Sequence, residues 1–200
     1  HNALLQNWPQ YKLLAKKVKD YLNLLPPSAV MAGVYTMVDN TRGVWKAPAN
    51  VSVNYVNRPE VNINNREQED LNVPANGKAI NAIRSFIGEG IKVWGARTLD
   101  SNSLDWRYIN VRRTMIFLEE SVKNAAHAYV FEPNDANTWL NIKYMIENFL
   151  RGVWKRGGLA GATPEDAFSV HVGLGDTMTP EDVLEGIMRV TVLVAISRPA

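Results

Sequence analysis

Apolar side chains recur at helical spacing over two stretches of the first forty residues. From Tyr11 to Leu25 the apolar positions follow the i, i+3, i+4, i+7 pattern, and lysines lie between them. Pro26 and Pro27 are expected to end this helix. A second helix is expected to begin at Ser28, whose hydroxyl is a suitable N-cap, and to extend to Val38.

The same spacing returns twice in the second half of the chain. One helix of about four turns is predicted by the 4-3-4-3 spacing of Val111, Met115, Leu118, Val122 and Ala125. Asn134 or Asp135 is expected to cap the next helix, and Gly157 and Gly158 are expected to end it. Its predicted buried face is broad: Trp139, Ile142, Met145, Ile146, Phe149, Leu150, Val153 and Trp154. A further helix start is predicted at residues 179–182.

Short apolar runs between these helices predict strands. They cover residues 80–86, 91–99, 128–131, 168–172 and 187–196. The first two runs are separated by Gly88-Glu89-Gly90, which favours a hairpin turn. Strands that alternate with helices indicate an α/β fold, here one mixed sheet flanked by helices.

Residues 43–76 interrupt this pattern and are rich in asparagine and charge. Within them, residues 51–55 alternate as a strand does, and a helical turn is possible at residues 67–71. We expect an extended surface arm or loop outside the core.

Composition narrows the possible functions. The chain has 200 residues, 46% of them hydrophobic, a net charge of +2 and no cysteine. This excludes global disorder, a disulfide scaffold and any cysteine-ligated metal. No apolar run is long enough for a membrane helix, and the three histidines lie far apart in the sequence. We therefore expect no catalytic residues, no metal site, no cofactor and no membrane insertion.

Two alternative functions remain open on the residues alone. Gly88 to Gly95 could serve a nucleotide-binding α/β domain or enzyme, although a strand rather than a helix is predicted to follow. Several tryptophans have basic neighbours, as in some nucleic-acid-binding modules. The small net charge and the apolar helix face that holds Trp139 and Trp154 favour packing and protein contacts instead.

Several ungapped segments, in their order and spacing, resemble the carboxy-terminal core of contractile tail sheath proteins. They are PPS (26–28), AGVY (32–35), RGVWKAPAN (42–50), INAIR (80–84), GIKVWGARTL (90–99), WRYINVRR (106–113) and FEPND (131–135). This family forms the contractile tails of phages and related injection systems. The resemblance spans residues 25–200.

The resemblance implies a structural subunit that polymerises helically around an inner tube and contracts to drive the tube through a target envelope. The implied partners are other sheath subunits, the tube protein, and baseplate and terminator proteins, without nucleic acid. Assembly is expected in the cytoplasm of the producing bacterium, and the product is a virion tail or a released particle. Residues 1–25 would link to an upstream portion, 26–200 would form the sheath core, and the family's final strand would follow residue 200.

The resemblance also assigns roles to charged residues. Arg151, Lys155 and Arg156, at the end of a predicted helix, are candidates for contacting an acidic tube surface; an ordinary solvated helix end is the alternative. A second set comprises candidates for subunit interfaces or internal ion pairs: Arg97, Arg107, Arg112, Arg113, Glu119, Glu120 and Glu132. Within this set, Glu119 is expected to pair with Lys123 at i, i+4.

Overall fold

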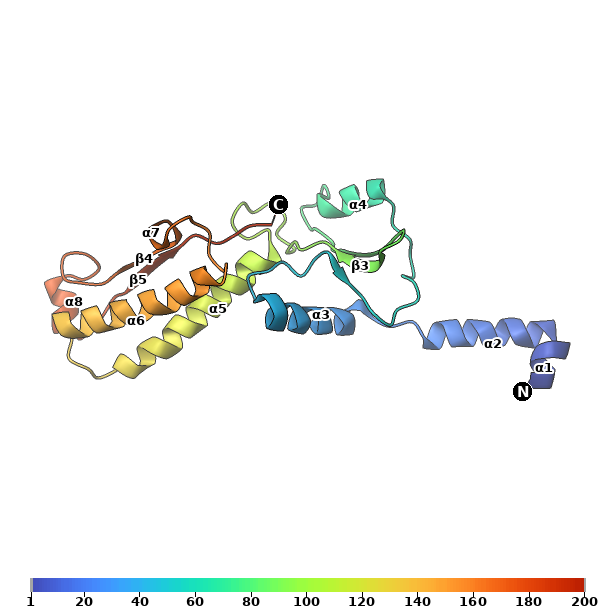
Figure 1. The fold of residues 1–200 in the computed structure, drawn as a ribbon, viewed down its shortest axis with the longest axis horizontal. Coiled ribbons are helices and arrows are strands. Elements are labelled where there is room, and N and C mark those ends of the chain that lie inside the picture. The colour runs from blue at the N-terminus through green and yellow to red at the C-terminus, as the bar shows by residue number, and fades with distance from the viewer. Residues whose placement is uncertain (1, 200) are drawn as a thin grey trace.

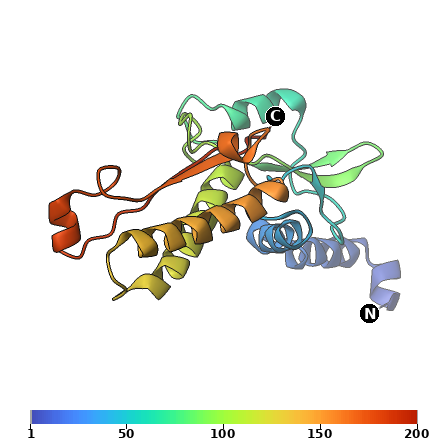
Figure 2. The same cartoon turned by 60° about the vertical axis from the view of Figure 1, so that its left-hand side comes forward.

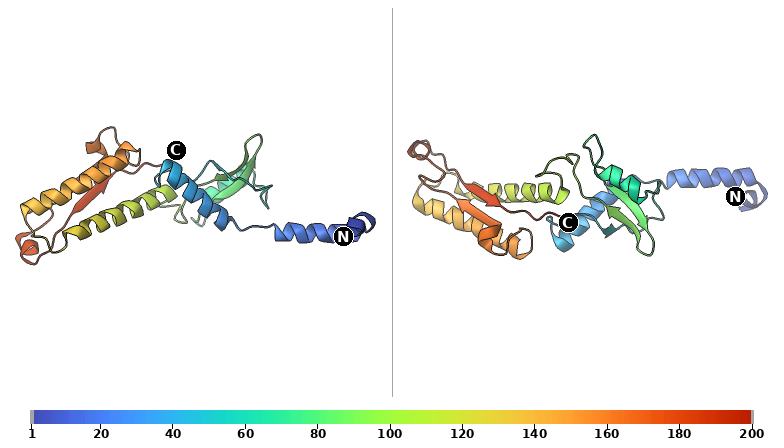
Figure 3. Two further views of the ribbon diagram at one scale, coloured as in Figure 1. Left: turned by 60° about the horizontal axis from the view of Figure 1, so that its bottom comes forward. Right: turned by 90° about the horizontal axis from the view of Figure 1, so that it is seen from above.

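Two lobes follow one another along an elongated molecule, and a pair of helices projects beyond them (Figure 1). The computed structural model describes residues 2–199. The projecting pair consists of α1 (Asn2–Asn7) and α2 (Pro9–Leu22). Both panels of Figure 3 show this pair extending away from the rest of the chain.

The first lobe is a three-stranded antiparallel sheet with a helix packed on it. Strands β2 (Ala82–Phe86) and β3 (Gly90–Trp94) form a hairpin, and β1 (Val51–Ser52) pairs with the other edge of β3. Helix α3 (Pro27–Arg42) contributes Val34 and Val38, which pack against Val93. The short helix α4 (Asn65–Asn72) begins at Asn64, which forms a capping box with Glu67.

The second lobe is built from two long helices and a two-stranded ribbon. These are α5 (Ile109–Ala126), α6 (Ala136–Lys155), and the antiparallel strands β4 (Phe168–His171) and β5 (Thr191–Val194). Figure 2 shows the ribbon continuing outward to α8 (Pro180–Leu184); α7 (Pro164–Ala167) precedes β4. The core of this lobe includes Leu118 of α5, Phe168 and Val170 of β4, and Ile142, Ile146, Leu150 and Val153 of α6. The buried face predicted for α6 is confirmed.

Trp45 and Asn110 join the two lobes. Trp45 follows α3 and packs against the core of the second lobe. A Cβ atom at Gly43 would lie 2.4 Å from the Trp45 ring, and one at Gly158 would lie 2.9 Å from it, so glycine at both positions leaves room for the indole. The Asn110 side-chain amide donates to the carbonyl oxygens of Trp45 and Ser197, at 3.1 and 3.0 Å.

The α/β class is confirmed, but its sheet arrangement differs from the single mixed sheet expected. The strands form two separate antiparallel sheets, because each strand pairs with a strand of its own lobe. Residues 128–131 are not a strand: η1 (His127–Tyr129), a 3-10 helix, leads into a turn. The last expected strand is shorter than predicted and covers only Thr191–Val194. Just before it, the Thr177 hydroxyl donates to the carbonyl oxygen of Arg189, and the Arg189 guanidinium donates to the Asp182 carboxylate. These bonds take the place of strand pairing at Arg189.

One local prediction at the amino-terminal end is also corrected. Ser28 does not cap α3, which begins at Pro27 after Pro26 without a side-chain cap. The fixed φ of Pro27 suits the first helical position, so the helix begins before the serine.

Residues 43–76 are in part inside the core, contrary to expectation. Ala47 and Pro48 are buried, and so is Gln68 of α4. Gln68 donates to the carbonyl of Trp94, and Arg84 donates to the carbonyl of Ile63. Hydrogen bonds between residues far apart in the sequence therefore hold this segment on the first lobe, and the local sequence pattern could not predict them.

The second lobe depends on the burial of one face of α6, which a leucine pair on that helix tests. Replacing the fully buried Leu150 by alanine is expected to lower the free energy of unfolding by about 2–5 kcal/mol, because it leaves a cavity. The matched substitution of Leu140, which is 50% exposed, is expected to change it by less than about 0.5 kcal/mol. Urea denaturation measures both, and equal effects would contradict this packing.

Candidate assembly surfaces

The glycine turn considered for nucleotide binding is the tip of a hairpin. Gly88 and Gly90 adopt φ values of 79° and 80°, and β3 follows them directly. A phosphate loop needs a helix amino-terminus after the glycines, and here there is none. Within residues 2–199, no group of three or more His, Asp or Glu side chains is arranged to hold a metal ion. The same part of the chain has no helix long and apolar enough to cross a bilayer.

All four of the predicted interface arginines lie over aromatic rings, and three of them do so in one region. The guanidinium carbons of Arg97 and Arg107 each lie 5.8 Å from the ring centre of Tyr108, and that of Arg112 lies 5.1 Å from Trp106. All five residues belong to the loop between β3 and α5 or to the start of α5. A shallow depression here is lined by Thr98, Leu99, Asp100, Trp106 and Arg112.

Arg113, the fourth of these arginines, forms an ion pair between the lobes. Its Nη1 and Nη2 atoms donate to the two carboxylate oxygens of Asp39 at 2.9 and 2.6 Å. The guanidinium also lies 4.9 Å from the ring centre of Tyr35, so it contacts α3 twice. The hydrogen bond from Arg113 to Asp39 is the main cause of a raised Arg113 pKa.

The predicted glutamates do not pair with these arginines. Lys123 contacts Glu120 at i, i+3, with 3.5 Å between Nζ and Oε1, instead of Glu119 at i, i+4. Glu119 and Glu132 are exposed, and neither forms an ion pair within residues 2–199. The glutamates lie toward the far end of α5 and beyond it, whereas the arginines cluster at its start.

All three basic residues at the end of α6 are exposed, and one of them is held by contacts within the chain. Arg156 lies 5.2 Å from the Trp45 ring centre, and its Nε donates to the carbonyl of Gly152. Arg151 and Lys155 are exposed and form no ion pair within the described chain. Of the three predicted tube-contact residues, these two are therefore available to a partner.

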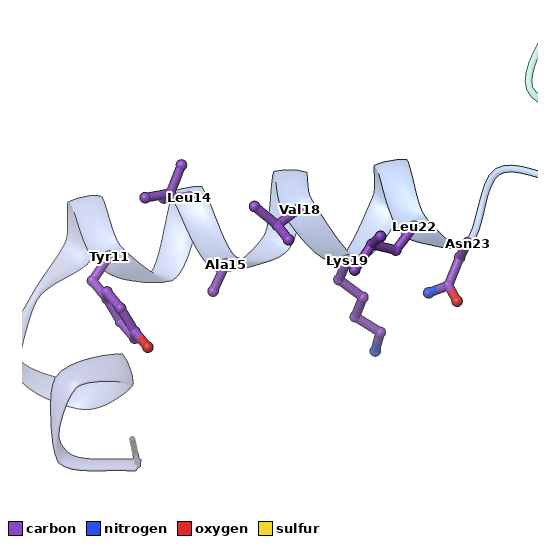
Figure 4. A pocket seen from close by; sticks show the side chains of 7 residues that line it. All are labelled: Tyr11, Leu14, Ala15, Val18, Lys19, Leu22 and Asn23. Atoms are coloured by element: carbon purple, nitrogen blue, oxygen red, sulfur yellow. The ribbon is translucent and has the colours of Figure 1, made fainter.

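Helix α2 presents a largely exposed apolar face. Tyr11, Leu14, Ala15, Val18 and Leu22 line one side of the helix with Lys19 and Asn23 (Figure 4). Leu14 is 60% exposed and Leu22 is 71% exposed, and no residue of α2 is buried. The helical spacing identified this face, but only the structure shows that neither lobe covers it.

The opposite end of the molecule combines apolar and acidic side chains. Phe131 is fully exposed, with a left-handed φ of 70°, and Leu184 is 86% exposed. The Asn134 amide donates to the carbonyl of Ile187 and so ties the Phe131 loop to the segment that follows α8. We call Phe131, Glu132, Glu181, Leu184, Glu185 and Ile187 the acidic end.

Asp182 stabilises the start of α8 at this end. The Thr179 backbone N–H donates to its carboxylate at 2.9 Å, and Arg189 donates at 3.0 Å. The bond from the Thr179 backbone is the main cause of a lowered Asp182 pKa. The carboxylate thus forms, with Thr179, the capping box that begins α8.

Comparison with known proteins confirms the resemblance to the contractile tail sheath family. Residues 101–183 match the family model described as the phage tail sheath C-terminal domain. The tail sheath protein of Vibrio phage KVP40 is 27% identical over 178 residues, 88% of this chain and 25% of that protein. That of Burkholderia phage BcepMu is 29% identical over 143 residues, 69% of this chain and 30% of that protein.

Two solved structures share the fold at higher identity. A chain in the cryo-EM structure of the PVC sheath complex, an extracellular contractile injection system in its contracted state, superposes with a TM-score of 0.83 at 46% identity. A chain of the anti-feeding prophage baseplate superposes with a TM-score of 0.81, also at 46% identity. Each match covers 88% of this chain and 48% of the other, so the chain spans about half the length of these relatives.

The ion pair between the lobes gives a testable stability difference. Asp39→Asn is expected to lower the free energy of unfolding by about 1–2 kcal/mol, because it removes a two-point charged bond whose side chains are only 27% and 32% exposed. Asp105→Asn breaks the more exposed pair with Arg198 and is expected to cost less than about 0.5 kcal/mol. Chemical denaturation compares them, and a larger loss from Asp105→Asn would contradict this ranking.

Proposed function

We propose that this chain is the core of a sheath subunit that polymerises helically around an inner tube and contracts to drive the tube through a target envelope. The observation that carries the proposal is the superposition on a sheath chain in the contracted state, at 46% identity over 88% of this chain. Identity at this level over nearly the whole chain supports a shared role as well as a shared fold.

The physical character of the molecule suits this role. A sheath subunit must repeat around a tube through contacts that do not close on themselves, which requires different surfaces at its two ends. Here the ends differ in chemistry: α2 is apolar and lysine-rich, whereas the acidic end carries carboxylates. Contraction would move such subunits as rigid bodies between two packings.

The partners and location follow from the same proposal. Neighbouring subunits, the inner tube, and baseplate and terminator proteins would contact the sheath, and no substrate would be converted. Assembly would take place in the cytoplasm of the producing bacterium before the particle is released. Identity is 46% to the two injection-system chains and 25–29% to the curated phage and prophage proteins, which favours an injection-system particle.

Electron microscopy of the full-length protein tests the proposal. With its tube protein present, we expect long hollow cylinders with regular helical striation in negative stain. A protein that remains monomeric at every concentration with its tube would contradict the sheath role. A shift in melting temperature on adding nucleotide would instead favour the nucleotide-binding alternative.

The exposed basic residues of α6 offer a test of tube contact. Arg151→Glu with Lys155→Glu is expected to weaken co-assembly of full-length sheath and tube about tenfold at low salt, because the proposed contacts are charge pairs at a surface. Co-sedimentation measures this, and the expected difference shrinks as salt rises.

A matched double reversal controls for net charge. Lys78 and Lys123 are also exposed, but they lie away from the end of α6. Lys78→Glu with Lys123→Glu is expected to leave co-assembly near the wild-type value. Equal behaviour of the two double variants would refute a specific tube contact at α6.

A further inference from the structure

The apolar face of α2 is not packed against either lobe. None of the residues described in α1 or α2 is buried, and α2 has only 14 residues. A helix of this length is marginal in water unless an apolar face is packed. Trp8 stacks on Tyr11 at one end of the face, but both lobes lie elsewhere and neither of them covers it (Figures 1 and 4).

The charges around this face specify what would cover it. At about 100° per residue, Lys12 and Lys19 border the apolar face on one side and Lys17 borders it on the other, whereas Lys16 points away. Residues 2–25 contain four lysines and one aspartate, a net charge of +3. The matching surface must therefore be apolar and acidic.

The acidic end of the same chain has this chemistry. Leu184 and Phe131 are exposed there, and so are Glu181, Glu185 and Glu132, which lie close to them in the sequence. Residues 173–190 contain four acidic side chains and one arginine, a net charge of −3. Figure 1 shows α8 and α2 at opposite ends of the long axis, so one molecule cannot bring them together without rearranging.

We propose that the acidic end of one copy docks on the apolar, lysine-bordered face of α2 in a second copy. The contact joins unlike surfaces head to tail, so it propagates along an open assembly instead of closing into a dimer. Apolar burial supplies the attraction, and the bordering charges set orientation and the rate of association. This inference rests on the proposed sheath function and names one of its subunit contacts.

Charge reversal in the full-length protein tests the contact. Lys12→Glu with Lys17→Glu and Lys19→Glu, or Glu132→Lys with Glu181→Lys and Glu185→Lys, is expected to raise the concentration needed for assembly about tenfold at low salt. Combining both sets restores complementarity and is expected to return the value to near wild type. Light scattering and negative-stain microscopy measure assembly.

Matched controls carry the same types of substitution elsewhere. Lys16→Glu lies on the far side of α2, and Glu69→Lys lies on an exposed position of α4; both are expected to assemble as wild type does. Unchanged assembly in both triple variants, or no rescue in the combined variant, would overturn the docking. If the wild-type protein still forms cylinders in that case, the docking contact is wrong but the proposed sheath function is not affected.

Thermal melting of the unassembled subunit distinguishes this contact from the alternative that another part of the full-length subunit covers α2. The lysine triple variant is expected to melt within about 2 °C of wild type, because the proposed partner is a second copy. A larger fall, not restored by reversing the acidic end, would mean that another part of the full-length subunit covers α2, and would overturn the proposal. If wild-type protein forms no cylinders with its tube, the sheath function itself fails.

Discussion

Asn110 holds together three parts of the chain that are far apart in sequence. Its buried amide donates to carbonyls of Trp45 and Ser197, while Trp45 packs against the core of the second lobe. The Asp39–Arg113 pair adds a charged bond across the same joint. Because each lobe has its own core, the orientation of one lobe to the other depends on this small set of contacts.

A subunit of a mechanical polymer has two structural requirements. Within each lobe, tight packing keeps the body rigid, as the fully buried positions of α6 illustrate. At its surfaces, contacts must be individually modest, because neighbours exchange partners when the assembly changes state. The exposed charges of α2, α6 and the acidic end suit contacts of this kind in the proposed assembly, where repetition over many copies would make their sum large.

The sequence located several of these charged residues without identifying their partners. Within one subunit, the described arginines do not pair with Glu119, Glu120 or Glu132, because they gather at the start of α5 and contact Tyr108, Trp106 and Asp39 instead. Helical spacing gives the face of one helix but not which distant segment meets it. The tube-contact and interface roles stay predictions, although Arg156 is now seen held over Trp45.

By itself, the sequence determined most of the helices, the hairpin and the family resemblance. Periodicity, caps and glycine turns act over a few residues, so the hairpin at Gly88 and a start of α6 capped by Asn134 or Asp135 followed from the sequence; the structure shows Asp135 as the cap. Tertiary structure decided the separation into two antiparallel sheets, the burial of Ala47 and Gln68, and the exposure of α2. The first two features depend on pairing between residues tens of positions apart, where the free energy of burial and long-range hydrogen bonds outweighs local preference. The exposure of α2 arises because neither lobe packs against it.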